Sequence, residues 1–133
     1  MLVFISIKYH PDQRNRGLIE SLSEAITSLG WETVCVVRDI EDWGATSFKP
    51  PVLMQKTFDA IHSSDLVVVE LSEKGVGVGI EAGYTHALGK PVVVVAPKGV
   101  DISATLQGIA SQVLFYEEIV EVSSVLKTSF PGS

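Results

Sequence analysis

Short apolar runs, rich in β-branched residues, alternate along the chain with longer segments in which apolar residues recur every three or four positions. The short runs have the length of strands and the longer segments have the period of amphipathic helices. The pattern predicts five strands, at residues 2–7, 31–37, 65–71, 91–96 and 112–116. Helices are expected over about 13–29, 52–62, 79–88 and 102–110 and near the C-terminus, with Gly30 and Gly89 as natural helix stops. The short C-terminal tail "SFPGS" is expected to fray.

Continuous apolar strands separated by helices indicate a parallel sheet that is covered on both faces. The predicted fold class is therefore α/β: one doubly wound, flavodoxin- or Rossmann-like domain over residues 1–133, with a five-stranded parallel sheet in the order 2-1-3-4-5. In such sheets, ligands bind where the strand order reverses, outside the carboxyl ends of the first and third strands. The loops that leave these ends are "KYHPDQRNR" and "SEKGVGVG", the most polar and most unusually composed loops of the chain. We therefore expect a ligand site there.

Composition narrows the class of ligand. The chain has 133 residues, 46% of them hydrophobic, and a net charge of -6, which argues against binding a nucleic acid polymer through a basic face. A nucleotide monomer remains open, because one or two cations and backbone amides suffice to hold a phosphate. One cysteine and three scattered histidines give no metal-ligand spacing, so no metal is expected and Cys35 reads as a buried strand thiol. Without a signal peptide or an apolar run of membrane-spanning length, the chain is expected to be cytoplasmic and to have no membrane partner.

The stretch "GVGVGIEAGY", residues 75–84, combines a glycine-rich loop with a carboxylate. Its G-x-G-x-G spacing is neither the dinucleotide fingerprint nor a P-loop, and on its own it could simply form a tight strand-to-helix turn. Glu81 is expected in the first turn of the following helix, among apolar or small neighbours. There it either complements the helix dipole or acts, beside a backbone-lined cavity, as a nucleophile or general base. Cleavage at the anomeric carbon of a ribosyl group requires such a carboxylate.

The segment "SSDLVVVELSEKGVGVGIEAGYTHALGKPVVVV", residues 63–95, resembles the core of the nucleoside 2-deoxyribosyltransferase family. In that family a strand that begins at Asp leads to a glycine loop, then to E-x-G-Y/R-A and G-K-P. "FISIK", "GVGVGIE" and "ISATLQG" resemble in particular its 2′-deoxynucleoside 5′-phosphate N-hydrolase branch. The resemblance implies cleavage or transfer of the N-glycosidic bond of (deoxy)nucleosides or their 5′-monophosphates by a glutamate nucleophile, without a cofactor. It also implies a homodimer or larger homo-oligomer.

The resemblance also assigns roles to individual residues. Glu81 matches the nucleophile, and Asp65 matches the aspartate that leads the third strand. Tyr9 resembles a family tyrosine that orients the nucleophile, although a surface aromatic is an equally open interpretation. Lys8 stands where the hydrolase branch has an arginine near the ligand. Ser103 stands where that branch has a serine that reaches the phosphate bound by a neighbouring subunit.

Substrate binding is expected from the glycine segment and the basic residues near it. The backbone amides of Gly77 to Gly79, together with Lys8 and Arg16, are expected to hold the 5′ side of the sugar. Gly75 stands where the transferases carry an aspartate that contacts the base and where the phosphohydrolase carries a phosphate-binding serine. Part of the set of side chains that contact the substrate in the family is therefore missing.

Other residues have more ordinary interpretations. Thr57 stands where relatives often have an aspartate. Glu70 could line the pocket, but a charge at a strand end is more commonly solvated, so Glu70 is expected to face solvent, as are Glu73 and Lys74.

Three alternatives stay open at this stage. The stretch "EAGYTHALGKP" also resembles TIR-like NAD glycohydrolases. A nucleotide-binding module without turnover would fit the missing side chain at Gly75, and a purely structural doubly wound domain would leave the cleft without a ligand.

Overall fold

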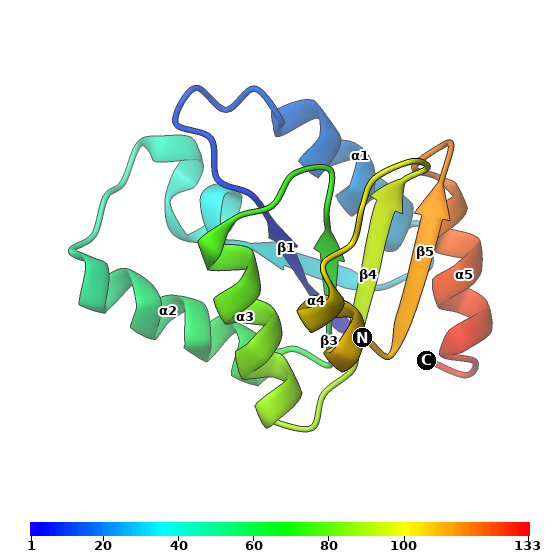
Figure 1. Cartoon of the computed structure of the whole chain (residues 1–133). Coiled ribbons are helices and arrows are strands. Elements are labelled where there is room, and N and C mark those ends of the chain that lie inside the picture. Colours follow the sequence, from blue (N-terminus) through cyan, green and yellow to red (C-terminus); the bar gives the residue numbers. More distant parts are fainter.

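The computed structural model describes residues 1–133 and shows a five-stranded, all-parallel sheet between two layers of helices (Figure 1). The strands run in the order β2-β1-β3-β4-β5, which confirms the predicted fold class and topology. Their bounds are β1 Leu2–Ile7, β2 Glu32–Cys35, β3 Leu66–Glu70, β4 Val92–Pro97 and β5 Gln112–Tyr116.

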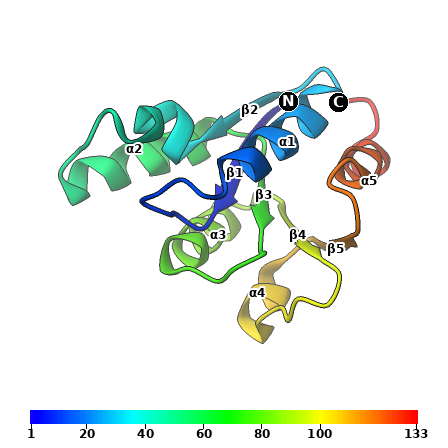
Figure 2. The same cartoon turned by 90° about the horizontal axis from the view of Figure 1, so that it is seen from above.

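The helices divide between the two faces of the sheet, as the view from above shows (Figure 2). Two of them cover one face: α1 Arg16–Thr27 and α5 Glu121–Ser129. Three cover the other: α2 Pro50–Ser63, α3 Val76–Ala87 and α4 Ala104–Ile109. None of these helices has both the length and the apolar character that a membrane span requires.

Side chains that alternate along each strand supply two separate cores. On β1, Val3 and Ile5 pack under α1 and α5, whereas Phe4 packs on the side of α2, α3 and α4. On β3, Val67 and Val68 likewise point to opposite faces and both are fully buried. Burial on both faces is the physical reason why these strands read as continuous apolar runs.

The chain leaves β2 earlier than the apolar pattern predicts. The strand ends at Cys35, and the next residues form a single π-helical turn, η1 (Val36–Ile40), followed by a 3-10 turn, η2 (Asp42–Gly44). The Asp39 carboxylate accepts a hydrogen bond from the backbone N–H of Cys35 at 2.8 Å. The backbone N–H of Glu41 closes the π turn on the carbonyl of Val36 at 2.9 Å. These local bonds turn the chain at the carboxyl end of β2.

The glycine segment also differs from its prediction. Helix α3 begins at Val76, whereas the sequence pattern predicted a start near residue 79. Gly75 is the N-cap, with extended backbone (φ -156°), and its carbonyl accepts from the N–H of Gly79 at 3.3 Å. Gly77 and Gly79 are therefore helix residues, and a Cβ at either would meet open space. Glu81 consequently lies in the second turn of α3, not in the first.

The C-terminal tail makes contacts with the body of the protein. The Phe130 ring packs edge-on against Trp31, with ring centroids 6.4 Å apart. The indole N–H of Trp31 donates to the main-chain oxygen of Ser133 at 3.2 Å. Trp31 is 5% exposed, so the tail covers an aromatic residue that would otherwise face solvent.

Two glycines provide a test of this backbone. Gly83 lies inside α3, and a methyl group on its Cα would meet open space, so Gly83→Ala is expected to stabilise the fold by about 0.5–1 kcal/mol. Gly30 ends α1 at φ +83°, so Gly30→Ala is expected to destabilise it by about 1 kcal/mol. Urea unfolding of both variants measures these changes, and effects of the same sign would contradict the helix bounds.

Candidate active site

A cavity of about 450 Å³ opens at the carboxyl edge of the sheet, over the end of β1. It lies at the predicted place, next to the point where the strand order reverses, and its volume is in the range of small-molecule sites. The walls come from the end of β1 and its loop (Ile5, Ile7, Lys8, Tyr9, His10, Asn15), the turn after β2 (Cys35, Val36, Val37, Glu41), α2 (Leu53, Met54, Thr57) and the start of α3 (Gly75, Val76, Gly77, Val78, Glu81).

Glu81 faces this cavity from α3 and is held by a single hydrogen bond. Its Oε1 accepts from the hydroxyl of Ser6 at 2.6 Å. Ser6 is 1% exposed and lies on β1, paired with Val69 of β3. Burial raises the pKa of the Glu81 carboxyl to about 7, and the Ser6 hydrogen bond acts against this rise. The group therefore changes charge near neutral pH.

The hydrogen bond to Glu81 that was expected from Tyr9 comes instead from Ser6. Tyr9 lines the cavity, but its side chain is 55% exposed and the hydrogen bond to Glu81 comes from Ser6. The physical reason is position: Ser6 is inside β1, directly against α3, whereas Tyr9 follows the strand in the loop. A lone hydroxyl inside the apolar run "LVFISI" was the signal that could have identified Ser6.

Asp65, which was expected among the catalytic residues, is not part of this site. It precedes β3 at the opposite, amino edge of the sheet, and its carboxylate accepts from the backbone N–H of Leu2 at 2.7 Å. The length of β3, roughly 16 Å, separates it from the cavity. Asp65 ties the starts of β1 and β3 together.

Lys8, Gly75 and Gly77 all line the cavity. Lys8 directly follows β1 and forms no ion pair with any carboxylate of the chain. A Cβ at Gly75 would stand 3.4 Å from Lys8 Cγ, at ordinary van der Waals distance, so the two residues are direct neighbours on the cavity wall. The first backbone N–H groups of α3 begin beside them, and together with the ammonium they could hold an anion.

Arg16, Gly79 and Ser103 lie outside the cavity. The guanidinium of Arg16 bonds Glu20 at 2.9 Å and stacks over the Trp43 ring, 4.2 Å from its centroid, so it is not directed at a ligand. Gly79 and Ser103 line a second hollow of about 170 Å³ between α3 and α4. That hollow shares Gly75 and Val78 with the main cavity.

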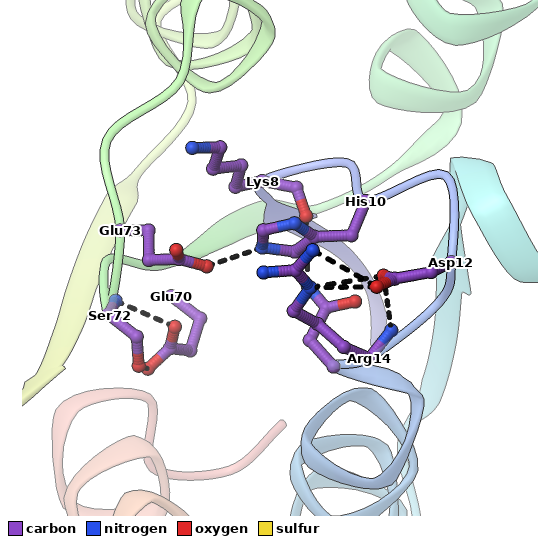
Figure 3. Close-up of polar contacts among 8 residues, drawn as sticks. Lys8, His10, Asp12, Arg14, Glu70, Ser72 and Glu73 are labelled. Atoms are coloured by element: carbon purple, nitrogen blue, oxygen red, sulfur yellow. Dashed lines mark hydrogen bonds and ion pairs between the residues drawn. The ribbon is translucent and has the colours of Figure 1, made fainter.

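A polar pair joins the loop that contains Lys8 to the loop that follows β3 (Figure 3). His10, which is 7% exposed, pairs with Glu73, and this contact lowers the pKa of the Glu73 carboxyl. Arg14 pairs with Asp12 at 3.0 Å within the first loop. The His10–Glu73 pair, which the sequence analysis did not anticipate, joins the β1–α1 loop to the β3–α3 loop.

Glu70 is buried, contrary to the expectation that it faces solvent. Only 1% of it is exposed, and its carboxylate accepts from the backbone N–H and the hydroxyl of Ser72, both at 2.8 Å, and from the hydroxyl of Tyr116. Burial and the neighbouring carboxylate raise the pKa of Tyr116. Glu70 does not line the cavity; it fixes the start of the loop that leads to Gly75. The structure contains no cluster of three potential metal ligands.

Comparisons with known proteins show where a similar chain and a similar fold occur. No family model matches the sequence. A protein of Thermofilum pendens with the name "Putative 2′-deoxynucleoside 5′-phosphate N-hydrolase 1" is 24% identical, over 100% of this chain and 97% of its own length.

Solved structures with the same fold include two enzymes of nucleosides or nucleotides. The CMP N-glycosidase BcmB of Clostridium botulinum superimposes with a TM-score of 0.71 at 18% identity, over 98% of this chain and 100% of its own. A 2-deoxyribosyltransferase of Bacillus psychrosaccharolyticus gives a TM-score of 0.73 at 14% identity, over 92% and 90%. The resemblance predicted from residues 63–95 is thus confirmed: in sequence over its whole length, and in fold, this chain is similar to the nucleoside 2-deoxyribosyltransferase family and its nucleotide N-hydrolase branch.

Proposed function

We propose that this protein is an enzyme that cleaves the N-glycosidic bond of a nucleoside or nucleoside 5′-monophosphate, or transfers its sugar to another base, with Glu81 as nucleophile. The observation that carries the proposal is the desolvated Glu81 carboxyl group on the wall of the cavity, anchored by Ser6. The names of the relatives, an N-hydrolase, an N-glycosidase and a deoxyribosyltransferase, support the same chemistry.

The chemistry follows from how the carboxylate is held. The Ser6 hydroxyl occupies Oε1, which leaves Oε2 to approach C1′ of the sugar. As the bond from C1′ to the base breaks, its electron pair leaves with the base, and the carboxylate bonds or stabilises the electron-poor carbon. Water then attacks C1′ to complete hydrolysis, or a second base attacks to complete transfer. The proton that the attacking water or base loses goes to the departed base, so that the steps need no other reactant.

The side of the cavity that carries Lys8 would hold the 5′ end of the substrate. The Lys8 ammonium, free of protein carboxylates, and the first N–H groups of α3 form an anion site at one end of the cavity. Gly75 keeps this corner open because it has no side chain. Arg16 is not part of the proposed site, since Glu20 and Trp43 occupy its guanidinium.

We also propose that the protein acts as a homodimer or larger homo-oligomer. The α3 surface beside the cavity exposes two apolar side chains one turn apart, Val76 at 83% and Ile80 at 45%. Ser103 lines the hollow next to it. A second copy packed over α3 would cover the apolar side chains and bring its own Ser103 towards this side of the molecule.

Replacement of the nucleophile tests the function. Glu81→Ala is expected to lower free-base release from nucleosides and their 5′-monophosphates by at least about a thousandfold, because no other carboxylate is held by Ser6. Chromatography of released base measures this. Glu24→Gln, on the exposed surface of α1, is the matched control and should keep the wild-type rate.

Equal base release by wild type and Glu81→Ala would remove Glu81 from the mechanism. Nicotinamide release from NAD in the same assay would favour the TIR-like alternative. Nucleotide binding without any product would favour the non-catalytic module.

The pH dependence follows from the raised pKa of Glu81. An unperturbed carboxyl titrates at 4.5 and that of Glu81 at about 7, so between these values the folded state holds a proton that the unfolded state has lost. The free energy of unfolding is therefore expected to fall as the pH rises from 4.5 through 7. Over the same pH range kcat should rise, because the nucleophile ionises. Urea unfolding of wild type and Glu81→Gln at pH 5 and pH 8 measures the first effect. A wild-type stability loss that persists unchanged in the variant would contradict the assignment.

Lys8 is expected to discriminate substrates by their phosphate. Lys8→Ala should raise KM for 5′-monophosphates by about ten- to a hundredfold, because a charge-assisted contact to phosphate is lost, and should change KM for nucleosides little. Lys74→Ala is the control, because Lys74 is exposed and faces Asp101. Equal effects of Lys8→Ala on both substrate classes would exclude it from the phosphate site.

A further inference from the structure

A second carboxyl group, that of Glu41, also lines the cavity. Glu41 follows the π turn at the end of β2, is partly buried, and makes no hydrogen bond or ion pair through its carboxylate. Burial raises the pKa of this carboxyl. A partly desolvated acceptor without a partner gains more from an incoming N–H donor than the same group would gain in water.

The topology places Glu41 and Glu81 on different sides of the ligand. β2 and β3 flank β1 on its two sides, so the turn after β2 and the helix after β3 form facing walls over the end of β1. With the phosphate beside Lys8 and the sugar beside Glu81, the base extends towards the wall built by the β2 turn and α2. This placement rests on the proposed function.

Glu41 is the polar group that a base would meet on that wall. Its neighbours there, Val36, Val37, Leu53 and Met54, are apolar. The hydroxyl of Thr57 donates to the carbonyl of Leu53 within its own helix at 2.8 Å and does not need a ligand.

The backbone around Glu41 is tightly held. The carbonyl of Glu41 accepts from the N–H groups of Gly44 and Thr46, at 2.9 and 3.0 Å. Asp42, Trp43 and Gly44 then follow in the left-handed region, with φ of 46°, 55° and 89°. Such a run costs free energy and persists only where surrounding contacts enforce it.

The β1–α1 loop and α1 supply those contacts. Gln13 donates to the carbonyl of Trp43, and the Arg16 guanidinium covers the Trp43 ring. Arg16 thus acts on the site indirectly, by fixing the turn that carries Glu41.

We propose that Glu41 accepts a hydrogen bond from an exocyclic amino group of the substrate base, so that the protein selects amino bases such as cytosine and adenine over their oxo counterparts. A carboxylate only accepts hydrogen bonds. The N4 amino group of cytosine donates to it, whereas the O4 carbonyl of uracil, in the same position, brings two acceptors together. A site built around such a polar contact rejects the mismatched analogue because buried groups are left unpaired. Gly75 stands where the family has an aspartate that contacts the base. Glu41 would supply base recognition in its place, from the opposite wall of the cavity.

Calorimetric binding of isosteric nucleotide pairs tests the proposal without turnover. In the Glu81→Ala protein, 2′-deoxycytidine 5′-monophosphate is expected to bind at least about tenfold more tightly than 2′-deoxyuridine 5′-monophosphate, and the adenine nucleotide similarly more tightly than the hypoxanthine one. Adding Glu41→Gln should reduce the ratio to about threefold or less, because an amide both donates and accepts. The change is isosteric and breaks no contact within the chain, so the thermal midpoint should be kept.

Asp42→Asn is the matched control, since Asp42 is the adjacent, exposed carboxylate and lies outside the cavity. It should leave the amino-to-oxo ratio unchanged. An equal affinity for both members of each pair, a ratio that survives Glu41→Gln, or the absence of nucleotide binding would overturn the proposal. A Glu41-dependent preference in a protein whose wild type releases no base would support base recognition by Glu41 while defeating the proposed enzyme activity.

Discussion

The hydrogen bond from Ser6 to Glu81 is the contact on which the functional part of this structure depends. It joins a buried position of β1 to the second turn of α3 and holds one oxygen of a carboxyl group at the wall of the cavity. Burial alone would favour the neutral acid, whereas the hydroxyl favours the carboxylate. The balance keeps the group close to its point of ionisation near neutral pH, where a small change in surroundings, such as a bound cationic transition state, changes its charge.

The fold supplies the rigidity that this contact requires. β1 lies between β2 and β3, so a side chain at its carboxyl end meets elements from both neighbours. Polar contacts of two glutamates, Glu70 and Glu73, hold the loops around it. Glu70 fixes the start of the β3–α3 loop through Ser72 and Tyr116, and Glu73 joins the same loop to His10. Beside the cavity, His10 is thus paired with Glu73, while the side chains of Lys8 and Glu41 have no partner within the chain.

This distribution of paired and unpaired groups divides the cavity into three parts. Lys8 and the start of α3 form a cationic end, Glu81 lies on the α3 wall, and Glu41 stands among apolar residues of the β2 turn and α2. A nucleotide has the same sequence of groups: phosphate, anomeric carbon, and a flat base with polar edges. The match between the two is the physical basis of both proposals.

The sequence by itself determined the sheet, its order and the edge at which the cavity opens, because continuous apolar strands can only be buried between two layers of helices. It also singled out Glu81 as a candidate, since a carboxylate among small and apolar neighbours after a glycine run is unusual. The tertiary structure decided the partners. Ser6 and Glu81 are 75 residues apart and Glu70 and Tyr116 46 apart, and no local pattern encodes such pairs. It placed Asp65 at the amino edge of the sheet and the Arg16 guanidinium over the Trp43 ring. It also brought Glu41 to the cavity through a π turn, in a segment whose apolar pattern up to Val37 predicted a strand. Side-chain direction at strand ends depends on hydrogen bonds made across the fold, and these form only when the chain has packed.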